Sequence, residues 1–116
     1  MSQRNIAEIS SNDAQQSLSD YQVVDVRSPG EYLGELGHIE GARLVPLGEL
    51  AQAFDLLEAG KPVLTVCRSG SRSLAAAMSL TERGFDATNL SGGMIAWRAA
   101  GLPVSFAPTT EPQKGR

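Results

Sequence analysis

Short apolar runs alternate along this chain with segments in which apolar residues recur every three or four positions. The runs lie at residues 6–9, 21–26, 42–46, 62–66 and 85–90, and we expect each to form a β-strand. Helices are predicted at about residues 10–18, 47–57 and 73–83 and after Gly93, with a short one beginning at Pro29. Such alternation predicts an α/β domain with a mainly parallel central sheet covered by helices on both faces.

The 116 residues are enough for one domain, because 41% of them are hydrophobic and can form a core without disulfide or metal support. We place this domain at residues 1–104. Prolines and polar residues dominate the end of the chain, so residues 105–116 are predicted to be a flexible tail. No internal disulfide is possible with one cysteine, and the single histidine, His38, belongs to no cluster with metal-ligand spacing. We therefore expect no metal and no other cofactor.

Charge gives no indication of a nucleic-acid or membrane-surface partner. The net charge is −3, and residues of both signs are interspersed along the chain. The first residues lack the long apolar segment of a signal peptide or membrane span. A free cysteine is typical of a reducing compartment, so a cytoplasmic location is expected.

The strongest chemical signal is Cys67, which follows the apolar run of residues 62–66 and precedes an alanine-rich helical segment. A strand, a short loop and a helix in this order direct backbone N–H groups and the positive end of the helix toward one point, where negative charge is favoured. A thiol at this point is expected to be mostly thiolate. A lone cysteine is commonly a small buried apolar residue, but two arginines and a glycine directly after it favour a reactive thiol.

Four patches of the sequence, in this order, resemble the single-domain rhodaneses, a family of sulfurtransferases. They are Asp25, Val26 and Arg27 with Glu31 and Tyr32; residues 37–42; residues 67–73; and Gly92 and Gly93 with Ala96 and Trp97. The resemblance extends from about residue 6 to residue 103 and implies the rhodanese-like fold. The segment Leu-Gly-Glu-Leu at residues 33–36 is slightly longer than is usual in the family, and we expect it to affect access or partner choice at the rim of the domain.

The resemblance also implies an activity. Cys67 would take sulfane sulfur from thiosulfate or another persulfide donor and hold it as a persulfide. It would then pass the sulfur to cyanide or to a thiol, either of a small molecule or of a protein. An alternative from another functional class is a persulfide carrier that binds a protein partner and turns over small molecules poorly. The sequence leaves both readings open.

The loop after the cysteine supplies the groups that hold an anionic sulfur donor. We expect its backbone N–H groups to point inward, with Gly70 allowing the tight curvature and the serines adding hydroxyl donors. Arg68 is predicted to face the donor, and Arg72 either faces the donor or braces the loop. The predicted substrate-binding residues are Arg68, Ser69, Gly70, Ser71, Arg72 and Ser73.

Loop length argues against a phosphatase or arsenate reductase. Four residues separate Cys67 from Arg72, whereas the related cysteine-dependent phosphatases resemble a pattern with five. A shorter loop forms a smaller cradle, which fits a sulfur atom better than a tetrahedral phosphate. A phosphatase also needs a carboxylic acid for the leaving group, and no residue stands out for that role.

Other polar and aromatic residues of the motifs are expected to be structural. Asp25 and Arg27 are predicted to pair at the end of a strand, and His38 is predicted to brace its glycine-rich loop through a hydrogen bond. Trp97 is expected in the core, on a short helix that covers the sheet.

Overall fold

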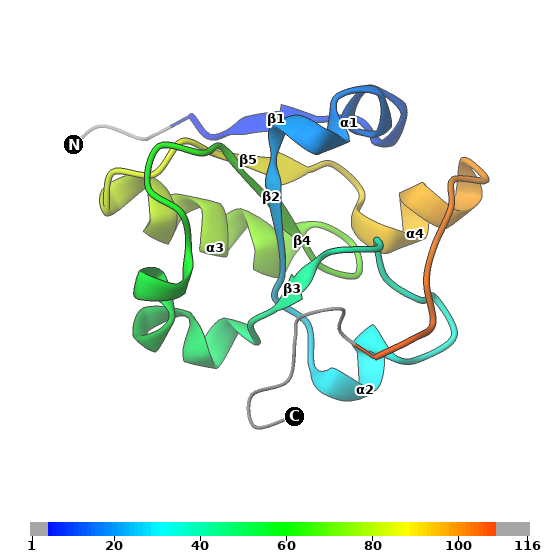
Figure 1. Cartoon of the computed structure of the whole chain (residues 1–116). Coiled ribbons are helices and arrows are strands. Elements are labelled where there is room, and N and C mark those ends of the chain that lie inside the picture. Colours follow the sequence, from blue (N-terminus) through cyan, green and yellow to red (C-terminus); the bar gives the residue numbers. More distant parts are fainter. Residues whose placement is uncertain (1–4, 109–116) are drawn as a thin grey trace.

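A five-stranded parallel sheet forms the centre of the computed structural model, which describes residues 5–108 (Figure 1). Its strands, in the spatial order β1-β5-β4-β2-β3, are β1 (Ala7–Ile9), β5 (Ala87–Leu90), β4 (Val63–Val66), β2 (Gln22–Asp25) and β3 (Arg43–Leu44). All four neighbouring pairs are parallel. The predicted α/β class and the strand predicted near the N-terminus are therefore confirmed, and that strand lies at one edge of the sheet.

Helices cover both faces of the sheet, as Figure 1 shows. The helix α3 (Ser71–Glu82) packs on one face together with the 3-10 helix η2 (Leu47–Gln52). On the other face, α1 (Ser11–Gln16) packs beside α4 (Gly93–Ala99). The 3-10 helix η1 (Leu18–Asp20) precedes β2, and the short helix α2 (Pro29–Tyr32) follows β2. The predicted three-layer arrangement is thus present.

The central strand β4 shows why the core has two halves. Side chains alternate between the faces of a strand, and all four residues of β4 are buried. Val63 packs in the cluster that includes Leu80 of α3, whereas Leu64 and Val66 pack in the cluster that includes Trp97 of α4. Trp97 is buried in the core, as predicted.

The segment of residues 47–57 differs from the expected α-helix. It forms η2 and a second 3-10 helix, η3 (Phe54–Leu56), joined at Ala53. Its backbone bonds span three residues, for example from Ala53 N to Leu50 O at 2.9 Å. Apolar residues three apart suit a 3-10 turn as well as an α-helix, and Gly48 lowers the helix propensity, so the spacing alone did not decide between them. Leu50 and Leu57 nevertheless reach the core.

The end of the domain contacts an earlier loop. Ser105 exchanges two backbone hydrogen bonds with His38, at 2.9 and 2.7 Å, although residue 105 begins the predicted tail. Residues 109–116 lie outside the described residues, so the boundary at 104 and the flexible tail remain predictions. Within residues 5–108, none of the helices has the length and apolar character needed to cross a membrane.

Candidate active site

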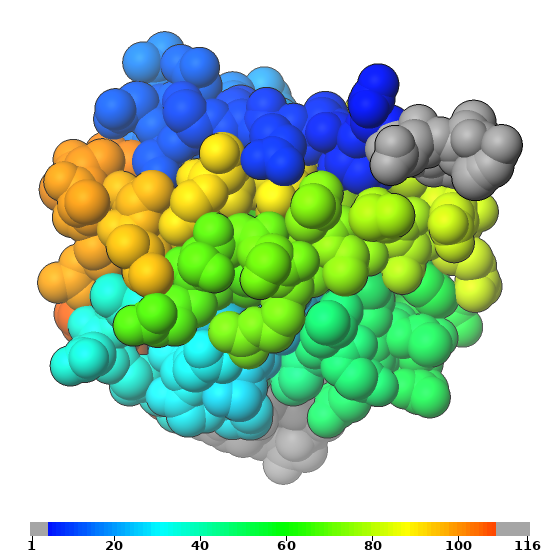
Figure 2. All heavy atoms as spheres, turned by 180° about the vertical axis from the view of Figure 1, so that it is seen from behind, coloured from blue at the N-terminus to red at the C-terminus, as the bar shows by residue number. Residues whose placement is uncertain are grey.

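The loop after β4 begins with Cys67, which has 0% exposed surface. Gly70 caps the following helix α3 with a φ of 110°, a left-handed conformation that side chains rarely adopt. Figure 2 shows the green surface of this loop region between the cyan surface around α2 and the yellow surface that leads into α4. The thiol is therefore covered by its neighbours.

Two donors converge on the sulfur of Cys67. The Gly70 N–H donates to Sγ with an N···S distance of 3.0 Å, and the Ser73 hydroxyl donates with an O···S distance of 3.2 Å. Burial raises the pKa of the thiol, but hydrogen bonds from Ser73 and from the Gly70 and Ser69 backbone lower it by more. The net pKa of Cys67 lies below its ordinary value, so the environment favours the thiolate.

The loop turns its N–H groups inward because other elements bind its carbonyls from outside. The first turn of α4 donates from Met94 N to Cys67 O at 2.9 Å and from Ile95 N to Arg68 O at 3.0 Å. This contact requires glycine at position 93, where a Cβ would lie 2.5 Å from both carbonyl oxygens. The predicted inward direction of the amides thus depends on a helix that begins 26 residues after the cysteine.

A buried polar pair on two neighbouring strands holds the rest of the loop. Thr65 of β4 and Asn89 of β5 are register partners. The Asn89 side-chain amide donates to Gly70 O at 3.1 Å, and the Thr65 hydroxyl donates to Ser73 O at 2.9 Å. These bonds fix the two residues that donate to the sulfur, so Thr65 and Asn89 position the loop without touching Sγ.

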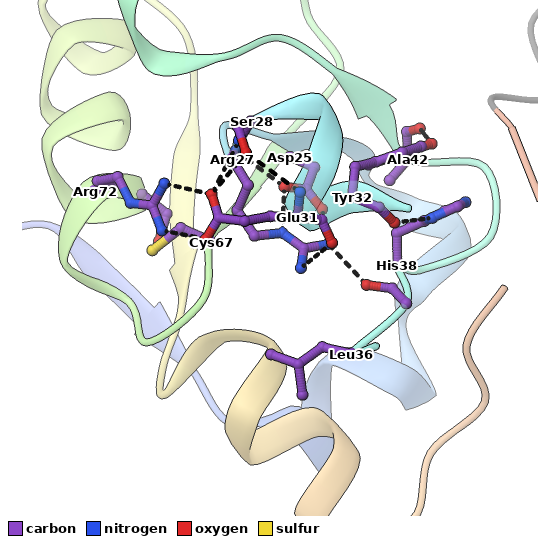
Figure 3. Close-up of polar contacts among 12 residues, drawn as sticks. Asp25, Arg27, Ser28, Glu31, Tyr32, Leu36, His38, Ala42, Cys67 and Arg72 are labelled. Carbon is purple, nitrogen blue, oxygen red and sulfur yellow. Dashed lines mark hydrogen bonds and ion pairs between the residues drawn. The ribbon is translucent and has the colours of Figure 1, made fainter. Parts of the chain in front are cut away.

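Arg72 braces the loop against α2, which is one of the two roles predicted for it. Its guanidinium makes two hydrogen bonds to the Glu31 carboxylate, at 2.8 and 2.9 Å (Figure 3). Glu31 also completes the N-terminal capping box of α2 with Ser28. The hydrogen bonds from Arg72 lower the pKa of Glu31 to about 2, so this pair is charged at neutral pH.

The remaining loop side chains point to solvent. Arg68, Ser69 and Ser71 are exposed. Of these, Arg68 has no hydrogen-bond or ion-pair partner within residues 5–108, which leaves its guanidinium available for an incoming anion. The hydroxyls of Ser69 and Ser71 make no bond to Sγ in this part of the chain, so hydroxyl donation comes from Ser73, and the other two serines remain predicted site residues.

The pair at the end of β2 is structural, as predicted. Asp25 and Arg27 are 0% and 1% exposed, and their shortest contact is 2.7 Å between Oδ2 and Nη2. Arg27 also donates to the carbonyls of Glu31 and Gly37, at 3.2 and 2.8 Å. The buried guanidinium therefore ties β2 to α2 and to the loop that follows it.

His38 braces its loop, in agreement with the sequence analysis. Its Nδ1 lies 2.8 Å from Tyr32 O, and its ring stacks on the Tyr32 ring with centroids 3.7 Å apart. The Tyr32 hydroxyl donates to Ala42 O at 2.6 Å (Figure 3). These contacts stabilise residues 32–42 and do not reach Cys67.

Sequence reasoning missed the supporting residues Glu31, Thr65, Asn89 and Met94 as parts of the site. A threonine and an asparagine in otherwise apolar strands were a usable signal, because buried polar side chains need hydrogen-bond partners. Glu31 belongs to the first patch that resembles the family, but that resemblance gave it no role at the loop. Met94 acts through its backbone, which no residue type indicates.

Comparison with known proteins identifies the family. The sequence model of the rhodanese-like domain matches residues 10–100. A sulfurtransferase of Allochromatium vinosum is 34% identical over 103 residues, which cover 85% of this chain and 94% of that protein. The thiosulfate sulfurtransferase GlpE of Pseudoalteromonas translucida is 35% identical over 82 residues, which cover 70% of this chain and 76% of that protein.

A solved structure shows the same fold. The rhodanese-related protein of Thermoplasma volcanium matches with a TM-score of 0.82 and 31% identity, over 87% of this chain and 99% of that one. Some relatives are considerably longer: the match spans 60% of YqhL of Bacillus subtilis and 45% of slr1261 of Synechocystis.

Proposed function

The chain belongs to the rhodanese-like family, which includes named sulfurtransferases, and on this premise we propose that Cys67 receives and delivers sulfane sulfur. One observation carries the proposal: a buried sulfur receives an N–H at 3.0 Å and a hydroxyl at 3.2 Å, in a loop whose carbonyls are bound from outside. Such a cradle stabilises a thiolate and, after loading, an anionic persulfide. We propose Arg68, Ser69, Gly70, Ser71, Arg72 and Ser73 as the residues that hold the donor.

The first half-reaction loads the cysteine. The Cys67 thiolate attacks the outer sulfur of thiosulfate, a new S–S bond forms, and the S–S bond of thiosulfate breaks with its electron pair leaving on sulfite. The charge balances, because the thiolate becomes a persulfide anion and the thiosulfate dianion becomes the sulfite dianion. Arg68, exposed and unpaired within residues 5–108, is the group best able to attract the oxyanion.

The second half-reaction unloads it. Cyanide or a thiolate attacks the terminal sulfur, the persulfide S–S bond breaks, and the electron pair returns to Cys67 as thiolate. With cyanide the product is thiocyanate. Neither half-reaction needs a general base when the thiol is already ionised, which agrees with the lowered pKa of Cys67.

The test is the mass of the intact protein after exposure to thiosulfate, followed by turnover with cyanide. We expect the gain of one sulfur atom, its removal by a reductant, and thiocyanate formation, all of which are absent from Cys67→Ser. The proposal fails if the wild-type protein gains no sulfur from thiosulfate or from an alkyl persulfide.

A persulfide carrier is the second candidate, because the matched region is only part of some longer relatives. Stoichiometric loading of Cys67 with negligible turnover on cyanide would favour the carrier, acting on a protein thiol in a cytoplasmic, reducing compartment. Hydrolysis of an aryl phosphate that depends on Cys67 would instead favour a phosphatase.

A further inference from the structure

A cavity of about 390 Å³ lies beside the loop, between α2 and Arg68. Its volume lies within the range of pockets for small ligands. Three of its lining residues, Gly30, Gly34 and Leu36, present backbone or apolar surface, and three others, Glu31, Glu35 and Arg68, are charged. A small donor that approaches the loop from this side meets both kinds of surface.

The charges around this cavity largely cancel one another. Arg27 also lines the cavity, but Asp25 neutralises it at 2.7 Å. Arg72 is held by the Glu31 carboxylate at 2.8 Å, which leaves Arg68 as the unpaired arginine among the lining residues within 5–108. Figure 3 shows the Glu31 carboxylate and the Arg72 guanidinium beside Cys67. The Cys67 thiolate, Glu31, Glu35, Arg68 and Arg72 together give a net charge of −1 around the loop and the cavity.

This balance acts differently on different sulfur donors. Thiosulfate is a dianion, whereas the persulfide of a small thiol carries one negative charge on its terminal sulfur. At the same position, the repulsion from the Glu31 carboxylate is twice as large for the dianion. The apolar part of the cavity suits the organic group of an alkyl persulfide, whereas the sulfonate of thiosulfate would meet the carboxylates of Glu31 and Glu35 as well as Arg68.

Given the proposed sulfurtransferase function, on which this step rests, we propose that Glu31 determines donor specificity and makes the site favour small alkyl persulfides over thiosulfate. Glu31 acts through Arg72: its two hydrogen bonds hold the guanidinium and cancel its charge. It is therefore a positioning residue, and it forms no bond with the transferred sulfur.

The experiment compares Glu31→Gln with the wild-type protein at low ionic strength. The donors are thiosulfate and the persulfide of N-acetylcysteine methyl ester, which has no other charge. The readout is the second-order rate constant for loading Cys67. Because the Coulomb free energy doubles with the donor's charge, a gain of about threefold with the persulfide implies a gain of about tenfold with thiosulfate. Added salt should reduce both gains.

Three variants separate charge from shape. Glu31→Asp keeps the charge, and Ser28→Ala removes the capping hydroxyl of α2 while Glu31 stays charged; both should keep the wild-type ratio between the donors. In Glu31→Gln with Arg72→Gln, the net charge returns to its wild-type value, and the preference for thiosulfate gained in the single variant should disappear.

The inference is overturned if Glu31→Gln leaves the donor ratio unchanged, or if Ser28→Ala shifts it equally. Should Glu31→Gln not fold, Arg72→Gln alone gives the same test with opposite sign, since it must weaken loading from thiosulfate more than from the persulfide. Failure of the underlying function looks different: the wild-type protein then loads from neither donor.

Discussion

Two arginine–carboxylate pairs lie at the carboxyl edge of the sheet, and they differ in burial. Asp25 and Arg27 are almost completely buried, and the guanidinium binds the carboxylate and two backbone carbonyls. Arg72 and Glu31 keep 40% and 31% of their side-chain surface exposed. Solvent screens the second pair and does not screen the first.

This difference separates a structural pair from an adjustable one. A buried charge that loses its partner keeps its full desolvation cost, so changes at Arg27 affect the stability of the whole fold. A half-exposed pair contributes little to stability, but it sets the charge beside the sulfur of Cys67. The same side-chain chemistry thus serves the fold in one place and the site in the other.

The largest expected effect is at the buried pair. Arg27→Met leaves the Asp25 carboxylate buried without its cation and should lower the free energy of unfolding by about 3–5 kcal/mol. Urea denaturation measures this change. Asp25→Asn combined with Arg27→Met should recover part of the loss, because no buried charge remains. A loss below about 1 kcal/mol in the single variant would show that the burial of this pair does not matter.

Asn89→Ala is expected to have the next largest effect. It removes the side-chain donor to Gly70 O, and a part-buried carbonyl that loses its partner costs about 1–2 kcal/mol. Because Gly70 then holds its N–H less firmly toward Cys67, the pKa of the thiol should also rise. Denaturation and the pH dependence of alkylation measure the two effects. Met78→Ala, at an exposed position of α3, is the control and should change neither.

Ser73→Ala removes the hydroxyl that donates to the Cys67 sulfur. The pKa of the thiol should rise, and alkylation at neutral pH should slow about fivefold, which corresponds to one hydrogen bond of about 1 kcal/mol. Ser71→Ala is the matched control, because the Ser71 side chain is exposed. In this variant, Cys67 should be alkylated at the wild-type rate. Equal alkylation rates in the two variants would show that the Ser73 hydroxyl does not stabilise the Cys67 thiolate.

The smallest effect is on acid stability at the exposed pair. The pKa of Glu31 is lowered from 4.5 to about 2, so its contribution to stability is present above pH 4.5 and is lost as the pH falls toward 2. Solvent screening limits this contribution to about 1 kcal/mol. Denaturation midpoints of wild type and Glu31→Gln should converge over this pH range. A difference between the two midpoints that does not change with pH would contradict the lowered pKa of Glu31.

The class of fold and the place of Cys67 at the start of its loop were accessible from local sequence. Apolar runs of strand length, the position of Cys67 after such a run and the glycine at position 70 each act within a few residues of chain, so their consequences follow from backbone geometry. The helix type of residues 47–57 was not accessible, because the same spacing of leucines suits α and 3-10 turns.

The partners of the loop were decided by tertiary structure. Arg72 had two predicted roles, and the choice between them depends on Glu31, which lies 41 positions earlier in the chain. Asn89 and Gly93 reach the loop only because β5 pairs with β4 and α4 begins directly after β5.

By itself, the sequence determined the alternating strands and helices, the end of the strand at which the cysteine lies and the positive end of the helix beneath it, because these are properties of neighbouring residues. Only the tertiary structure decided which carbonyls are bound from outside and which arginine of the loop has no partner among the described residues. Those outcomes depend on contacts between segments far apart in the chain, where sequence distance carries no information on spatial distance.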